Sequence, residues 1–171
     1  TNKIWNAARL LLATVDDGEK IKQDESTATE WPDRWIRSRL QQTIQATLKG
    51  MSEYKFNDAA EAVYQFVWHE YCDWYLELIK RRLYGTDPAA KLAAQRTAFS
   101  VLETSLRLMH PFVPFITEEL WQIINPDSGS IMMQRIPHLQ KQLINLESES
   151  QMKLLISLIS AIRNIRSDWN I

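Results

Sequence analysis

The sequence places basic side chains next to aromatic ones in several short stretches. Proteins bind single-stranded RNA by stacking bases on aromatic rings or guanidinium planes and by holding phosphates with Lys and Arg. These stretches could therefore bind RNA, although charged runs on helices are more often solvated faces and aromatic residues at helical spacing are more often core. The stretches are Trp31, Arg34, Trp35, Arg37 and Arg39; Tyr75, Lys80, Arg81, Arg82 and Tyr84; and Arg163 and Arg166.

Side chains suited to metal binding are sparse. His69 and the single cysteine, Cys72, are one helical turn apart, but two ligands do not make a metal site. His110 and His138 have no partner at metal-ligand spacing. Cys72 is therefore expected to pack as a small hydrophobic residue, and no metal site is predicted.

Two adjacent carboxylates, Glu118 and Glu119, follow Pro114 and Thr117 at the expected start of a helix. Acidic residues are favoured there because they interact well with the positive end of the helix dipole. We therefore interpret the pair as structural rather than as a general acid and base. No nucleophile and base can be assembled from the remaining residues, so the sequence predicts no catalytic residue and no cofactor in this chain.

Composition and charge restrict the kinds of protein this chain can be. The hydrophobic fraction is 45%, the charged fraction 24% and the net charge −1, values typical of a soluble globular domain and not of a strongly basic nucleic-acid-binding one. One cysteine fits a reducing compartment, and no signal peptide or long apolar run is present, so we expect a cytoplasmic monomer. The apolar pattern starts almost at Thr1, from which we expect a piece of a longer protein.

Apolar residues recur at three- and four-residue spacing along most of the chain, which predicts an all-α fold. Helices of about 20 residues joined by short loops pack antiparallel, so we expect an antiparallel helical bundle of about five helices plus a C-terminal helix after a linker. Three parts are expected: a bundle over residues 1–125, a linker packed on the bundle over 126–150, and a last helix over 151–171. A polar loop is expected over residues 14–30.

One long helix is predicted between the N-cap Asn57 and the C-terminal Gly85. A second helix boundary is expected at Asp87 and Pro88, as N-cap and first helical residue. The apolar stripe of the long helix steps by three or four residues through Ala60, Val63, Val67, Tyr71, Trp74 and Leu78.

Five segments of the sequence form a recognisable series. They are NKIWNAAR at 2–9, DRWI with SRL within 33–40, FVWHEYCDWYLE at 66–77, HPFVPFITEELW at 110–121 and AIRNIR at 161–166. In this order they resemble the anticodon-binding domain of class Ia aminoacyl-tRNA synthetases. The segments 66–77 and 161–166 are similar to the valyl-tRNA synthetases in particular, whereas 110–121 is shared with the leucyl and isoleucyl enzymes.

The resemblance implies a function and a set of site residues. Such a domain binds the anticodon stem-loop of tRNA-Val, whose splayed bases enter a pocket on the helical bundle. The family region expected along the pocket is the first helix, with Asn2, Lys3, Asn6 and Arg9, although Asn6 and Arg9 could instead tie this helix to its neighbours. Tyr75 and Leu76 are expected to form a wall against a base, and Lys80 and Arg81 are expected to contact phosphates.

Some aromatic positions need a separate interpretation. We expect Trp5, Trp35, Trp74 and Trp121 in the core, because they lie on or beside the apolar stripes. Leu10 stands where members of the family often carry Phe, which puts a stacking role at that position in doubt.

The resemblance also implies what this chain lacks. The ATP-dependent ligation of valine to tRNA belongs to a catalytic domain that precedes this one in the family, and an editing domain is inserted in that catalytic domain. Their motifs do not occur in this sequence, and the family's C-terminal coiled coil does not either. The expected partners are therefore the tRNA and the remaining domains of the same synthetase.

Three alternatives remain open at this stage. The chain could be the same domain of an isoleucyl- or leucyl-tRNA synthetase. It could instead be a helical protein-interaction module with no RNA role, which its near-neutral charge and apolar last helix would suit. The chain could also be an enzyme, but only if an active site forms around the histidines.

Overall fold

The computed structural model describes residues 2–15 and 30–169, and within them the chain is helical with no strand. The predicted all-α fold, a bundle of about five helices plus a C-terminal helix, is confirmed. Most of the loop predicted over 14–30 lies outside the described residues. The elements are α1 (Asn2–Leu12), α2 (Trp31–Ser52), α3 (Phe56–Gln65), η2 (Phe66–Tyr75), α4 (Leu76–Leu83), α5 (Pro88–Met109), α6 (Pro114–Ile124), η3 (Ile131–Met133), η4 (Lys141–Leu143) and α7 (Leu146–Asp168).

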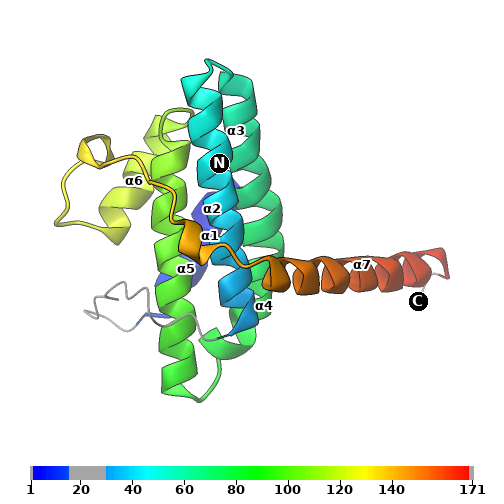
Figure 1. The fold of residues 1–171 in the computed structure, drawn as a ribbon. Coiled ribbons are helices and arrows are strands. Elements are labelled where there is room, and N and C mark those ends of the chain that lie inside the picture. The colour runs from blue at the N-terminus through cyan, green and yellow to red at the C-terminus, as the bar shows by residue number, and fades with distance from the viewer. Residues whose placement is uncertain (1, 16–29, 170–171) are drawn as a thin grey trace.

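Three long helical columns form the body of the molecule (Figure 1). They are α2, the continuous column α3–η2–α4, and α5, while α1 packs against η2, α5 and α6. The core between them is built from fully buried aliphatic and aromatic side chains. Its largest members include Ile4, Leu11, Ile36, Ile44, Phe66, Tyr71, Tyr75, Ile79, Leu102, Leu106 and Leu120.

A tight turn joins α2 to α3. Gly50 lies in the last turn of α2, where a Cβ atom would come within 3.0 Å of both the backbone nitrogen and the Cβ of Ala59 on α3. Tyr54 adopts a positive φ of 59° and reverses the chain. The helix therefore starts at Phe56 with Lys55 as its N-cap, and the prediction of Asn57 as the cap is wrong.

The middle of the long column is not an α-helix. Residues Phe66–Tyr75 form a π-helix, in which each backbone N–H bonds to the carbonyl five residues earlier; at its end the N–H of Leu76 donates to the carbonyl of Tyr71. The sequence predicted one uninterrupted α-helix here, and the structure corrects that prediction. The wider turn changes which side chains face the core, so the buried series runs through Val67, Tyr71, Tyr75 and Ile79.

Two predicted helix starts agree with the structure. Asp87 caps α5, and its Oδ1 accepts hydrogen bonds from the N–H groups of Ala89 at 2.9 Å and Ala90 at 3.3 Å. Pro114 opens α6 as its first residue. Both cases follow from fixed proline geometry at the first helical turn.

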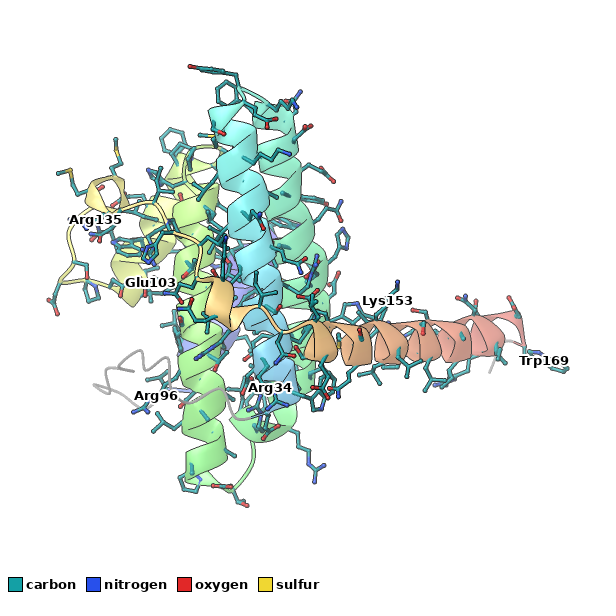
Figure 2. The ribbon with its side chains drawn as sticks, in the orientation of Figure 1. Arg34, Arg96, Glu103, Arg135, Lys153 and Trp169 are labelled. Carbon is teal, nitrogen blue, oxygen red and sulfur yellow. The ribbon has the colours of Figure 1, made fainter. Side chains whose placement is uncertain are left out.

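The C-terminal helix α7 begins at Leu146, earlier than the predicted start at Gln151. Asn145 caps it by accepting a hydrogen bond from the N–H of Ser148 at 2.8 Å. Its first turns pack on α2, and the rest of the helix projects away from the bundle (Figure 1). Trp169 lies near its far end, well beyond Lys153 (Figure 2).

Opposite faces of α7 have different surroundings. Met152 is fully buried against the bundle, and Arg163 lies over the ring of Trp74 on η2, with its guanidinium carbon 5.4 Å from the ring centroid. The outer face carries a stripe of apolar side chains that are exposed by about half or more: Leu154, Leu158, Ile162, Ile165 and Trp169. No helix among the described residues is long and apolar enough to cross a membrane.

Candidate nucleic-acid interface

The solvent face of α1 carries three polar side chains that are available to a ligand. Ile4, Ala8 and Leu11 turn inward and are completely buried, which leaves Asn2, Asn6 and Arg9 on the exposed side. Among the residues that the structure describes, none of these three makes a hydrogen bond or ion pair. The hydrogen-bond donors and acceptors of these side chains are therefore available to a ligand.

Lys3 is placed differently from the other α1 residues. Its Nζ lies 2.5 Å from Oδ1 of Asp73 on η2, and the other Asp73 oxygen lies 3.5 Å from Nδ1 of His69. The ion pair joins α1 to the π-helical segment. Because Lys3 is already paired, its positive charge is only partly available to a phosphate.

The π-helical segment connects three helices at once. Its wide turn directs Asp73 toward Lys3 on α1 and Glu70 toward Arg39 on α2, and it places Trp74 beneath Arg163 of α7. This is the same run of residues that resembled the valyl enzymes most closely. π-helical turns inside α-helices occur frequently at functional sites, so the segment supports a site beside α1.

Two predicted site residues are in the core. Tyr75 is fully buried and Leu76 is 4% exposed. The Tyr75 hydroxyl donates to Oδ1 of Asp33 at 2.8 Å, its ring packs on Tyr71, and burial raises the pKa of Tyr75 well above its usual value. Neither side chain offers a surface to a base, so the structure corrects the expectation that they form a wall of the pocket.

The two proposed phosphate contacts differ from each other. Lys80 Nζ pairs with Oε1 of Glu77 at 2.6 Å on the same helix. Arg81 is exposed and, within the described part of the chain, has no hydrogen bond or ion pair. The neighbouring Arg82 is not available to a phosphate, because its guanidinium donates two hydrogen bonds to the buried carboxylate of Asp33.

The four tryptophans that were expected in the core do pack there. Trp35 and Trp121 are 3% and 2% exposed, and Trp5 and Trp74 are partly buried against the core. The Trp121 indole N–H donates to the carbonyl of Gly129 at 2.9 Å. All four rings therefore contribute to the packing of the bundle.

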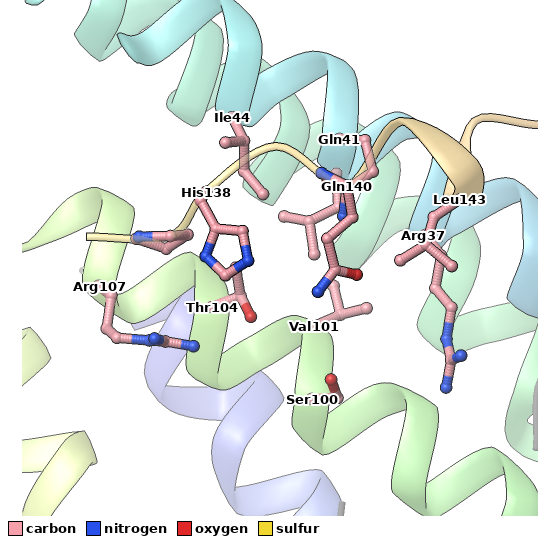
Figure 3. Close-up of a pocket in the computed structure, with 12 residues that line it drawn as sticks. Arg37, Gln41, Ile44, Ser100, Val101, Thr104, Arg107, His138, Gln140 and Leu143 are labelled. Carbon is pink, nitrogen blue, oxygen red and sulfur yellow. The ribbon is translucent and has the colours of Figure 1, made fainter. Parts of the chain in front are cut away.

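A separate cavity of about 200 Å³ lies between α2, α5 and the segment 137–143. In Figure 3 the His138 ring lies over Thr104, with the Arg107 guanidinium nearby, whereas the Arg37 guanidinium points away. No residue of α1 lines the cavity, so it is not part of the surface that carries Asn6 and Arg9.

Metal-ligating residues do not gather in the described part of the chain. No group of three His, Cys, Asp or Glu side chains there is arranged to hold a metal ion. Burial raises the pKa of the Cys72 thiol to about 12, so the thiolate needed for metal binding or nucleophilic attack is scarce at neutral pH. His110 instead shares a 2.7 Å hydrogen bond with the Thr117 hydroxyl.

Comparison with known proteins identifies relatives over nearly the whole chain. A family model described as the anticodon-binding domain of tRNA ligase matches residues 33–171. The valine--tRNA ligases of Bacillus cereus (strain ATCC 10987 / NRS 248) and Listeria monocytogenes serovar 1/2a are 38% and 40% identical over 169 residues, and that of Laribacter hongkongensis is 41% identical over 177 residues. Each alignment covers 99% of this chain and 19% of the relative, so the chain spans about a fifth of their length.

Proposed function

Because this chain belongs to the family of anticodon-binding domains of tRNA ligases, we propose that it binds the anticodon stem-loop of tRNA-Val through the solvent face of α1. The observation that carries this proposal is the exposure of Asn2, Asn6 and Arg9 on one helix face, where their side chains have no partner among the described residues. An Asn amide has both a donor and an acceptor and can pair with a base edge, and an Arg can hold a phosphate or stack on a base.

The charge of the chain fits a small, local contact. With a net charge of −1, the domain cannot attract RNA over its whole surface, so affinity must come from a few free cations near the bound loop. Arg9 on α1 is such a cation. Arg81 on α4 is a further cation whose side chain has no partner in the described part of the chain, and Lys80 becomes available if it exchanges Glu77 for a phosphate. Lys80 and Arg81 remain proposed phosphate contacts, whereas Tyr75 and Leu76 are no longer proposed to contact a base.

The chemistry of the parent enzyme is assigned to parts outside this chain. The relatives are valine--tRNA ligases about five times as long as this chain. We propose that ATP-dependent ligation occurs in those other parts and that this chain supplies anticodon recognition. A cytoplasmic location and a monomeric parent fit this role.

A second contact is supported by α7. Its outer stripe of Leu154, Leu158, Ile162, Ile165 and Trp169 is a continuous apolar surface of the kind that marks an interaction site. We propose that the other domains of the same synthetase cover this stripe in the parent enzyme. This role accounts for the apolar last helix without a separate protein-interaction function.

Substitutions on α1 test the proposal. We expect Arg9→Ala to weaken binding of the tRNA-Val anticodon stem-loop. The plot of the logarithm of the association constant against the logarithm of the salt concentration should become less steep by about 0.7, the value for one phosphate contact on a single strand. Asn6→Ala should instead weaken discrimination between loops, because a base-edge contact is lost. Both side chains are exposed, so the melting temperature should not change.

Lys49→Ala is the matched control, because it removes an exposed cation from α2. It should leave both affinity and salt slope unchanged. If Arg9→Ala and Asn6→Ala both bind the stem-loop as the unmodified chain does, the assignment of α1 as the binding surface is wrong.

A further inference from the structure

An aromatic cluster lies on the outer surface where α3 meets the π-helical segment. The rings of Tyr64 and Trp68 are stacked, with centroids 5.0 Å apart and an interplanar angle of 26°. The ring of His69 meets Tyr64 edge-on at 5.9 Å and 81°. Tyr64 is 43% exposed and His69 is also exposed, while Trp68 is partly buried against the core.

This cluster is directly connected to α1. His69 Nδ1 lies 3.5 Å from Asp73, and Asp73 lies 2.5 Å from Nζ of Lys3. On α1, Asn6 is one turn from Lys3 and therefore shares its side of the helix. The aromatic rings and the polar face of α1 thus form one continuous surface, joined by the chain His69–Asp73–Lys3.

Tyr64 is less involved in the core than Trp68. Trp68 packs partly buried against the core, whereas Tyr64 leaves 43% of its surface in solvent. A pair of rings on successive turns of an exposed helix stabilises it by only a few tenths of a kcal/mol. An exposed aromatic ring backed by a second ring is, by contrast, a flat and rigid surface on which a nucleobase can stack.

We propose that Tyr64, Trp68 and His69 form a stacking platform for one unpaired base of the RNA loop bound on α1. The proposal rests on the proposed function and adds to it the residues that hold a base by its face rather than by its edge. Every base has a π-face, so this platform supplies affinity and orients the loop, while the free amide on α1 supplies selectivity.

The test combines ring removal with base removal. The platform is partly exposed, so Tyr64→Ala should weaken stem-loop binding about five- to tenfold, at the lower end of the loss expected when a stacking ring is removed. Tyr64→Phe keeps the ring and should bind as the unmodified chain does. A set of stem-loops, each with one loop base replaced by an abasic site, identifies the stacked base: at that position alone, Tyr64→Ala should cause no further loss.

Phe56→Ala is the matched control, since Phe56 is 51% exposed and lies on the same helix α3. It should leave affinity unchanged. If Tyr64→Ala binds all stem-loops as the unmodified chain does while Arg9→Ala weakens binding, the platform is wrong and the proposed function stands. If the unmodified chain binds no stem-loop, both are wrong. Equal losses at every abasic position would also overturn the platform.

Discussion

Replacing Asp33 with alanine is expected to destabilise the bundle by about 3–5 kcal/mol, the cost of breaking a buried ion pair by removing one partner. The Asp33 carboxylate is completely buried and accepts two hydrogen bonds from Arg82, at 2.6 and 2.7 Å, and one from the Tyr75 hydroxyl at 2.8 Å. Alanine leaves the buried Tyr75 hydroxyl without its acceptor, and it leaves the Arg82 guanidinium with only Glu30, whose Oε2 lies 3.5 Å from Nε. Urea unfolding followed by circular dichroism measures the loss.

Asp58→Ala is the control for this variant. Asp58 is also an acidic residue in the first turn of a helix, α3, but it is exposed. Its loss removes only the interaction with the helix dipole, worth about 0.3–1 kcal/mol. Equal destabilisation by Asp33→Ala and Asp58→Ala would mean that Asp33 acts through the dipole alone, and the ion pair with Arg82 would then contribute nothing.

Arg39→Ala is expected to loosen α7 from the bundle and to cost about 2 kcal/mol, the scale of hydrogen bonds to a charged group. The Arg39 guanidinium donates to both oxygens of Glu70, at 2.7 and 2.8 Å, and lies 3.7 Å from Glu149 at the start of α7. Hydrogen bonds to Glu70 raise the pKa of Arg39. Without the arginine, two carboxylates face each other where α7 docks.

Hydrogen–deuterium exchange locates this effect. The amides of α7 should exchange faster in Arg39→Ala, while those of α5 keep their rates. Lys49→Ala removes an exposed cation from the same helix α2 and should change neither stability nor exchange. Unchanged exchange in α7 with Arg39→Ala would show that Met152 and the hydrogen bonds of Glu149 to Ser38 and Gln42 hold the helix without it.

The helical pattern predicted the bundle because apolar spacing depends only on local geometry. The prediction of the buried face was wrong inside the long column, where the predicted apolar stripe passed from Tyr71 to Trp74 and Leu78. The π-helical turns carry the buried series from Tyr71 to Tyr75 and Ile79 instead. Because of that change of register, Tyr75, which falls beside the predicted stripe, is found in the core.

Long-range pairing accounts for the other differences. The ion pair of Asp33 with Arg82 was not predicted, because nothing in the local sequence shows that these two residues lie side by side. The sequence analysis also did not single out the residues of the proposed platform. Its only indication in the sequence is the spacing of Tyr64 and Trp68, which are four residues apart, and aromatic pairs at this spacing usually belong to the core. By contrast, the inward positions of α1 follow from the spacing of its apolar residues, and Asn2, Asn6 and Arg9 lie on the exposed side.

The central claim is anticodon recognition, and its most direct test is a titration of this chain with two stem-loops at low salt. One carries the tRNA-Val anticodon loop, and the other differs only in the middle anticodon base, where the A is replaced. We expect the valine loop to bind more tightly by about 1–3 kcal/mol, the usual cost of one mismatched base in direct readout. Equal affinity for both loops would contradict the account, because it would leave only phosphate contacts at this surface.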